Sequence, residues 1–368
     1  MLGVLRRQRL NPAESAASLT REVAAIRRPV LGPFALGLAV VALTAAFALL
    51  WGAADIPPAT VGRILLERLG LPIEADWPGK WGAIVWEVRM PRVVLAGLVG
   101  ATLAYAGATY QGVFRNPLAD PYLIGVASGA GLGATLVIIS PLAYSFGPLS
   151  PVPAAAFAGA IVAVTLTYML ARVGPLVPIT TLILAGVAVG SIATAAISYL
   201  MLTNEDRALP ILSWLLGGFN TASWERVWLL LPYAAIGGLL LLPFGRTLNV
   251  LQLNEEQARQ LGVNVEAMKI TLLAVASLAT AAAVAVSGII GFVGLVVPHA
   301  ARLLWGPDHR RLLPLSAVLG ASFLILADLL ARSLAPPNEI PVGIITAFIG
   351  APFFLYLLRR QRRTMPYA

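Results

Sequence analysis

The stretch VVLAGLVGATLAYAGATYQGV, residues 93–113, decides the fold class of this chain. It contains no charged residue, and as a helix it is long enough to cross the hydrocarbon core of a bilayer, which takes about 20 apolar residues. Similar stretches recur along the chain, so the expected spans are 33–52, 93–113, 122–140, 152–171, 180–202, 224–244, 268–289, 291–305, 312–332 and 341–358. The span at 291–305 is short and contains Gly294 and Pro298, so we expect a broken or re-entrant element there. The sequence therefore predicts an all-α polytopic membrane protein with about ten transmembrane helices.

The composition agrees with a membrane protein and excludes an ordinary soluble domain. Of the 368 residues, 58% are hydrophobic and 12% are charged, against about 25% charged residues in soluble domains. The mean hydropathy is +0.83. The tail before the first span, residues 1–32, contains Glu14 and Glu22 and is long for the basic region of a signal peptide. We therefore expect the first span to be retained as a membrane anchor.

Several kinds of chemistry are excluded by residue type. There is no cysteine, and the two histidines, His299 and His309, do not form an HExxH motif. A disulfide, a thiolate site and a histidine-based metal centre are therefore not expected, and no cofactor is predicted. The two lysines, Lys80 and Lys269, lie outside any GxxxxGK[ST] sequence, so the chain has no loop of the type that holds ATP phosphates.

The distribution of positive charge predicts the orientation in the membrane. An even number of spans puts both termini on one side, and basic residues favour the cytoplasmic side. Basic residues gather in both tails, at Arg6, Arg7, Arg9, Arg21, Arg27 and Arg28 and in the segment 359–368. With both termini in the cytoplasm, most of the 26 basic residues lie inside. This asymmetry explains the net charge of +9 without a nucleic-acid partner.

The segment 246–267 is the most polar connection and should lie on the cytoplasmic side. Asn254 can cap a short helix that runs through Leu261, with Glu255 and Glu256 in its first turn, and Gly262 can end it. A capped polar helix outside the membrane is typical of a docking element, and a solvated loop is the alternative.

Three arginines mark the opposite side. Arg89 and Arg92 precede the second span, and Arg332 ends the ninth. Their guanidiniums can grip carboxylates of another protein, or extend to lipid phosphates. Asp328 lies four residues before Arg332, which favours an ion pair on one helix face, with a proton-coupling site as the alternative. The segment 53–92 on this side contains TVGRILLERLG, which predicts a helix on the membrane surface.

Several motifs together resemble one protein family. They are RNPLADP at 115–121, LILAGVAVG, WLLGGF, LNEEQARQLGVN, GFVGLVVPH, LADLLAR and GAPFFLYLL, in this order between about residues 86 and 360. They are similar to the FecCD-type permeases of bacterial type II ABC importers, which carry iron-siderophores, haem or cobalamin. The resemblance implies a permease domain over 33–358, between a cytoplasmic tail at 1–32 and a basic tail at 359–368. It also implies an inverted internal repeat, for which the sequence itself gives little support.

The resemblance also implies partners and residue roles. The partners are a second permease subunit, most simply in a homodimer, two cytoplasmic ATPase subunits and an extracytoplasmic substrate-binding protein. ATPase coupling falls to the loop 246–267, with Glu255, Glu256, Arg259, Leu261 and Gly262. The binding protein docks on Arg89, Arg92 and Arg332, and the cytoplasmic gate region matches Pro178, Ile179, Thr180 and Thr181.

The predicted function is therefore that of a permease subunit without catalytic residues, in the cytoplasmic membrane of a bacterium or archaeon. Two functions of other classes are the alternatives. An ion-coupled secondary transporter with Asp328 as its coupling site would not need a docking helix. An intramembrane enzyme would need a nucleophile and base or a metal cluster, and the sequence offers neither.

Overall fold

Helices make up almost all of the structure. The computed structural model describes residues 31–364 apart from 53, 142–149, 254 and 336–337. Each predicted span corresponds to a helix or lies within one, and their bounds are α2 Leu31–Leu50, α5 Met90–Phe114, α6 Val126–Ile139, α7 Val152–Ala171, α8 Ile179–Thr203, α10 Trp224–Leu241, α13 Val265–Ser287, α14 Val293–Trp305, α15 His309–Ser333 and α16 Val342–Thr364. The all-α prediction is confirmed. The tail 1–30 and residues 365–368 lie outside the described residues.

Seven of these helices are long and apolar enough to cross a membrane, and α6, α14 and the apolar part of α16 are shorter. Short elements join them: α3 Pro58–Arg68, α4 Gly79–Ala83, the π-helix η1 Ile84–Arg89, the 3-10 helices η2 Pro121–Ile124 and η4 Leu242–Phe244, α9 Glu205–Leu215, α11 Gly245–Leu251 and α12 Glu255–Gln260. The span predicted at 291–305 is thus a short helix, which begins after a backbone break. The inverted repeat stays a prediction.

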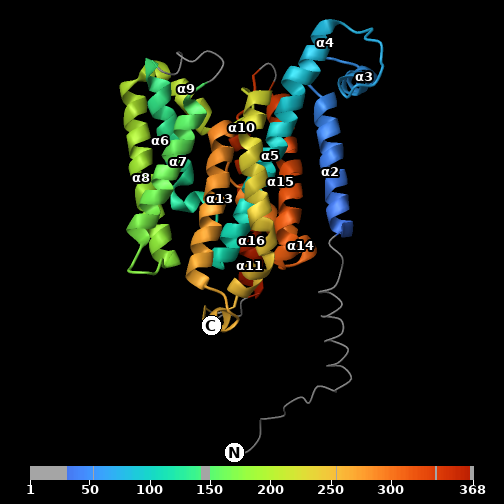
Figure 1. The fold of residues 1–368 in the computed structure, drawn as a ribbon. Coiled ribbons are helices and arrows are strands. Elements are labelled where there is room, and N and C mark those ends of the chain that lie inside the picture. The colour runs from blue at the N-terminus through green and yellow to red at the C-terminus, as the bar shows by residue number, and fades with distance from the viewer. Residues whose placement is uncertain (1–30, 53, 142–149, 254, 336–337, 365–368) are drawn as a thin grey trace, which may run out of the picture.

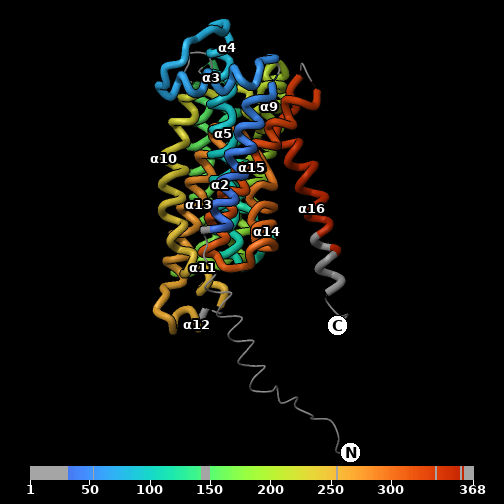
Figure 2. Tube along the Cα trace, turned by 90° about the vertical axis from the view of Figure 1, so that its right-hand side faces the viewer, coloured from blue at the N-terminus to red at the C-terminus, as the bar shows by residue number. Residues whose placement is uncertain are grey.

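The helices lie roughly parallel in one bundle with two distinct ends (Figure 1). One end carries α3, α4 and α9, and we call it the α3 end. The other end carries α11 and α12, and we call it the α12 end (Figure 2). Helix α2 begins and α16 finishes at the α12 end. The predicted outer arginines and the predicted coupling helix therefore lie at opposite ends of the bundle.

The core is formed around α5, α13 and α15. Between 67% and 78% of the most apolar stretches of these three helices is buried, against 17% for α2 and α8. Helix α5 packs against α15, α13, α10 and α14, while α6, α7 and α8 pack together beside this centre. In Figure 1, α8 lies at one edge of the bundle and α2 at the other. Helix α8 therefore has much apolar surface that this chain alone does not cover.

Helix α3 corrects one prediction. The segment TVGRILLERLG is helical, but Val61 and Ile64 are buried against Ile56 and Val85. The apolar face therefore covers protein at the α3 end instead of lying on lipid. Leu69, which follows the helix, is 76% exposed.

Glycines bring α5 into backbone contact with two neighbours. A Cβ atom on Gly100 would collide with the carbonyl oxygen of Gly320 on α15, and a Cβ on Gly320 would collide with that of Gly100. Gly107 meets the backbone of Gly294 on α14 in the same way. Small residues permit such approach between membrane helices, where dispersion contacts drive association.

We expect Gly100→Ala to destabilise the fold by about 1–3 kcal/mol, because the added methyl forces α5 and α15 apart. Gly97→Ala, one turn away on the same helix, is the matched control. Its Cβ would lie 3.4 Å from Ile325 Cδ1, an ordinary contact. The measurement is the melting temperature of the detergent-purified chain. Equal effects of the two substitutions would contradict the close approach at Gly100.

Candidate functional site

A wide groove runs along α8 and across the break before α14. Its volume is about 830 Å³. Its walls are mainly small, hydroxyl-bearing and apolar residues, together with one carboxylate: Asp120, Tyr122, Leu123, Gly125, Ser128, Gly186, Val187, Gly190, Ser191, Thr194, Ala195, Ser198, Gly291, Phe292 and Leu295. Ser191, Thr194 and Ser198 recur at helical spacing on α8 and are exposed. The sequence analysis missed this row, for which the spacing was the available signal.

The hydroxyl groups in the groove are largely satisfied by the protein itself. Thr194 donates to the carbonyl oxygen of Gly190 at 2.8 Å, and Ser198 donates to that of Thr194 at 3.0 Å. Ser128 donates to the carbonyl of Gly125 at 3.2 Å. A hydroxyl whose proton is already used can only accept a further hydrogen bond. The surface is therefore polar enough to be wetted but poor in donors that would hold a solute tightly.

Two turns fix the floor of the groove. In RNPLADP, Asp120 caps η2 by accepting from the backbone N–H of Tyr122 at 2.8 Å. Tyr122 donates through its hydroxyl to the carbonyl of Ile290 at 3.0 Å, which joins the two turns. Phe292 starts α14 with φ of 68°, a left-handed conformation that is uncommon for a non-glycine residue. The corner before α14 thus lines the groove, whereas the break expected at Gly294 and Pro298 is not found, because α14 is one continuous helix through both residues.

The three predicted docking arginines converge at the α3 end, but they face inward. Arg92 makes two hydrogen bonds from Nε and one from Nη2 to the carboxylate of Asp328, at 2.8–3.0 Å. Its outer edge, formed by Nη1 and Nη2, donates to the two carboxylate oxygens of Glu339 at 2.9 and 3.0 Å. Glu339 is 41% exposed, whereas the side chain of Asp328 is 2% exposed. Asp328 is thus a buried ion-pair partner, the default expectation for this residue.

Arg332 and Arg89 complete this cluster with backbone contacts. Arg332 lies 3.8 Å from Asp328 and donates to the carbonyl of Ala48 at the end of α2. Arg89 is 4% exposed and donates to the carbonyls of Leu49 and Ala54. We call Arg89, Arg92, Asp328, Arg332 and Glu339 the arginine cluster. It ties α2, α5, α15 and the connection before α16 together.

The connection before α16 also reaches the α9–α10 turn. The backbone N–H groups of Val342 and Gly343 donate to the carbonyls of Gly217 and Leu216 at 3.0 and 3.1 Å. Glu339 lies three residues before Val342, so Arg92 is linked through this connection to the WLLGGF turn. The arginine cluster thus joins elements from all along the chain at the α3 end.

The predicted coupling helix is present at the α12 end. Helix α12 spans Glu255–Gln260, and Gly262 follows it with φ of 82°, as expected for a helix stop. Ala258 is buried, whereas Arg259 and Glu256 are exposed and Leu261 is 62% exposed. The predicted cap Asn254 lies outside the described residues. Ala258 thus packs against the protein, while Leu261, Glu256 and Arg259 give the helix an outward face with apolar and charged side chains.

Polar contacts fix the helix before α12 to the bundle. Gln252 donates to the carbonyl of Gly112 at 2.8 Å, and Arg115 donates to that of Leu251 at 2.6 Å. Asn249 donates to Asp308 at 2.6 Å and accepts from the backbone N–H of His309 at 2.9 Å. These bonds attach α11 to the ends of α5 and α15. Helix α11, which precedes α12 in the chain, is therefore bonded to two core helices.

The electrostatics of Asp308 strengthen this attachment. Partial burial raises the pKa of this carboxyl, but hydrogen bonds from Arg310 and Asn249 outweigh burial and lower the pKa to about 2. Asp308 is therefore ionised at neutral pH and caps α15 through the N–H of Arg310 at 3.0 Å.

The predicted gate region also lies at the α12 end. Pro178 precedes α8, and Ile179, Thr180 and Thr181 form its first turn. The connection is held by Glu266 of α13, which accepts from the N–H of Val177 at 2.6 Å. Thr181 is partly buried, and Ile179 packs against the core. The structure brings this segment close to the start of α13, which follows α12.

Comparisons with known proteins give a consistent result. A model of the FecCD transport family matches residues 39–360. The ABC transporter permease protein YvrB of Bacillus subtilis is 44% identical over 90% of this chain and 94% of its own. The cobalamin import system permease protein BtuC of Halobacterium salinarum is 46% identical, with 88% and 84% covered. The hemin transport system permease protein HmuU of Yersinia pestis is 41% identical, with 82% and 92% covered.

Solved structures agree with the sequence comparisons. A metal-chelate type ABC transporter in an inward-facing conformation matches with a TM-score of 0.76 and 31% identity, over 89% of this chain and 98% of that one. Family model, relatives and fold point to the same group. This chain belongs to the FecCD transport family.

Proposed function

We propose that this chain is the permease subunit of a binding-protein-dependent ABC importer that carries a metal chelate across the cytoplasmic membrane. The groove along α8 is the observation that carries the proposal. Its volume of about 830 Å³ suits a bulky solute, and its self-satisfied hydroxyls bind weakly. The relatives named for cobalamin, hemin and iron-citrate import support a chelate as cargo.

The groove is one wall of the translocation path, and a second permease subunit supplies the other. Helix α8 is only 17% buried in its most apolar stretch, and large side chains such as Leu184, Ile192 and Leu202 are at least 65% exposed. A second copy that covers α8 would enclose the groove and bury this surface. A homodimer is the simplest assembly, because a single gene product then provides both walls.

ATP hydrolysis takes place on two partner subunits that dock at α12. Exposed Leu261 and Arg259 offer an apolar and a charged contact. Because α11 is bonded to the ends of α5 and α15, movement of α12 reaches the core helices. It also reaches the start of α8 through α13 and Glu266. The gate region at Pro178–Thr181 then opens or closes the groove toward the cytoplasm, with both chain termini on this side.

The substrate-binding protein docks at the α3 end, and the arginine cluster suggests which arginine receives its carboxylate. Arg92 keeps Asp328 as its buried partner, and its outer edge is occupied by the more exposed Glu339. A carboxylate on the binding protein would replace Glu339 and so pull on the connection to the α9–α10 turn. In this proposal Arg92 is the docking arginine, while Arg89 and Arg332 hold α2 in place.

The energy source tests the function as a whole. We expect uptake of a chelate by proteoliposomes to require the partner ATPase and ATP, and to continue after the proton gradient is collapsed. The purified chain alone should bind no ATP, because it has no phosphate-binding loop. Loss of uptake with the gradient, while ATP is maintained, would favour ion coupling instead. Asp328 is poorly suited to ion coupling, because Arg92 and Arg332 already neutralise it.

Coupling is tested at α12. We expect Leu261→Ser to reduce transport-linked ATPase stimulation by about tenfold, because an exposed apolar side chain at the centre of a contact can carry much of its affinity. Leu69→Ser, which alters another exposed leucine at the α3 end, is the matched control. Stimulation that survives Leu261→Ser, with the chain still folded, would remove α12 as the docking element.

The docking proposal is tested by removing the ion pair between Arg92 and Glu339. We expect Glu339→Gln to strengthen binding of the binding protein by up to about fivefold, because exposed ion pairs are worth about 0–1 kcal/mol. Added salt should weaken both complexes through screening. Glu205→Gln alters an exposed carboxylate of α9 at the same end and is the control. Unchanged affinity in Glu339→Gln would make Arg92 purely structural.

A further inference from the structure

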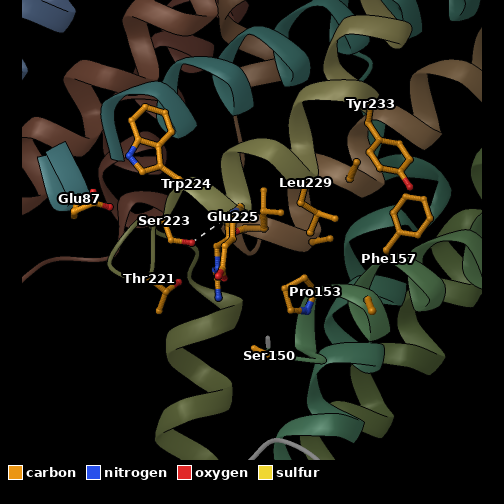
Figure 3. A pocket seen from close by; sticks show the side chains of 15 residues that line it. Glu87, Ser150, Pro153, Phe157, Thr221, Ser223, Trp224, Glu225, Leu229 and Tyr233 are labelled. Carbon is orange, nitrogen blue, oxygen red and sulfur yellow. Dashed lines mark hydrogen bonds between the residues drawn. The ribbon is translucent and has the colours of Figure 1, made fainter. Parts of the chain in front are cut away.

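A second cavity, which we call the crevice, lies between helices that do not line the groove. Its volume is about 950 Å³, and it lies between α7, α10 and α13, with η1 at its mouth. Figure 3 shows Pro153 and Phe157 on one wall and Trp224, Leu229 and Tyr233 on the other. None of the residues that line the groove lines this crevice. It therefore belongs to neither the translocation path nor the arginine cluster.

The crevice opens between helix faces whose exposed apolar side chains suit the hydrocarbon of a bilayer. The helices on its two sides, α7 and α10, expose large apolar side chains, among them Val162 and Met169 on α7 and Trp228 and Leu239 on α10. Inside the crevice, Phe157 and Tyr233 pack across it with ring centroids 5.3 Å apart. Its walls are mainly apolar, with Ala154, Ala282 and Val286 among them. An occupant must therefore be at least partly apolar and must enter from the membrane.

Aromatic residues indicate the level in the membrane at which the mouth of the crevice lies. The indole N–H of Trp224 donates to the carbonyl of Trp86 at 2.9 Å, and their rings lie 5.4 Å apart. Tryptophans gather at the level of the lipid headgroups. Arg226 follows Trp224 by two residues in the first turn of α10, so its side chain starts near this level. The mouth of the crevice thus lies where phosphates of the outer leaflet are found.

Arg226 is a partly buried cation that lacks an ion-pair partner. Among the described residues, its guanidinium donates only to the carbonyl of Val286, at 3.0 Å, and no carboxylate lies within ion-pair distance. A guanidinium has five N–H donors, so most of them remain for a ligand. A charge at the membrane boundary without an anion is costly. A phosphate suits the planar donor fork of arginine well.

We propose that this crevice binds one phospholipid of the outer leaflet, with its phosphate on Arg226 and an acyl chain along Phe157, Leu229 and Tyr233. The mouth also carries two exposed carboxylates, Glu87 and Glu225. An anionic headgroup would be repelled by them, whereas the ammonium of an ethanolamine headgroup complements them. The proposal therefore commits to phosphatidylethanolamine over phosphatidylglycerol.

The test is native mass spectrometry of the full transporter in detergent, titrated with palmitoyl-oleoyl phosphatidylethanolamine. We expect one lipid to be retained on each copy of this chain. Arg226→Ala should weaken this binding about tenfold or more, because a charge-assisted contact is lost. Arg226→Lys should restore part of it. Arg207→Ala, which alters an arginine of α9 at the same end outside the crevice, is the matched control and should have no effect.

Further experiments distinguish a phospholipid from a soluble phosphate as the ligand. Ala154→Phe, which fills the crevice from the exposed side of α7 and leaves Arg226 intact, should also abolish retention. Glycerophosphoethanolamine and inorganic phosphate should not compete, because they lack acyl chains. Competition by either would make the crevice a site for soluble anions and overturn the proposal. Retention that survives both Arg226→Ala and Ala154→Phe would place the lipid elsewhere.

The headgroup preference has its own test. Phosphatidylglycerol should bind about tenfold more weakly than phosphatidylethanolamine, and the double substitution Glu87→Gln and Glu225→Gln should remove this difference. Equal binding of the two lipids to the unaltered chain would overturn the assignment of the ammonium to Glu87 and Glu225.

Discussion

The whole bundle depends on how closely α5 approaches its neighbours. Within a bilayer no hydrophobic effect drives one apolar helix onto another, so contact area and backbone proximity decide which helices associate. Gly100 lets α5 touch the backbone of α15, and Gly107 lets it touch that of α14. These contacts put Arg92 of α5 opposite Asp328 of α15 at one end and Arg115 near Leu251 at the other. The packing of α5 therefore positions the proposed functional residues at both ends of the bundle.

The packing divides the chain into a rigid centre and an incompletely covered side. Helices α5, α13 and α15 are mostly enclosed, and every polar attachment of α11 leads to them or to the connections between them. Helix α8 carries the groove and is mostly exposed. This division suits a transporter, since the enclosed helices can transmit a movement from α12 while the exposed one forms a wall that changes shape against a partner. Weakly binding hydroxyls along α8 then allow a solute to leave as easily as it enters.

The sequence predicted the spans well because the requirement for apolar length in a bilayer is strong and local. It also placed α12 correctly, since the glycine stop at Gly262 acts within a few positions. The sequence did not predict that the arginine side chains point into the protein. Arg89, Arg92 and Arg332 were expected at one end, where they are found, but the sequence does not show that Asp328 lies opposite Arg92 across a distant helix. Glu339 carried no signal, because a charged residue in a loop is common, and the row Ser191, Thr194 and Ser198 resembled ordinary small residues of a span.

Four arginines at the α3 end, of which Arg89 and Arg92 are buried and Arg226 and Arg332 partly buried, differ in what neutralises them, and this difference separates their roles. Arg92 and Arg332 share the carboxylate of Asp328, and Arg89 has backbone carbonyls at the end of α2. Within the part of the chain that the structure describes, Arg226 has one carbonyl and an open crevice. Where the chain needs a charge for its own architecture, it supplies an acceptor from another helix. At Arg226 it supplies a cavity, and in our proposal a lipid phosphate is the remaining acceptor.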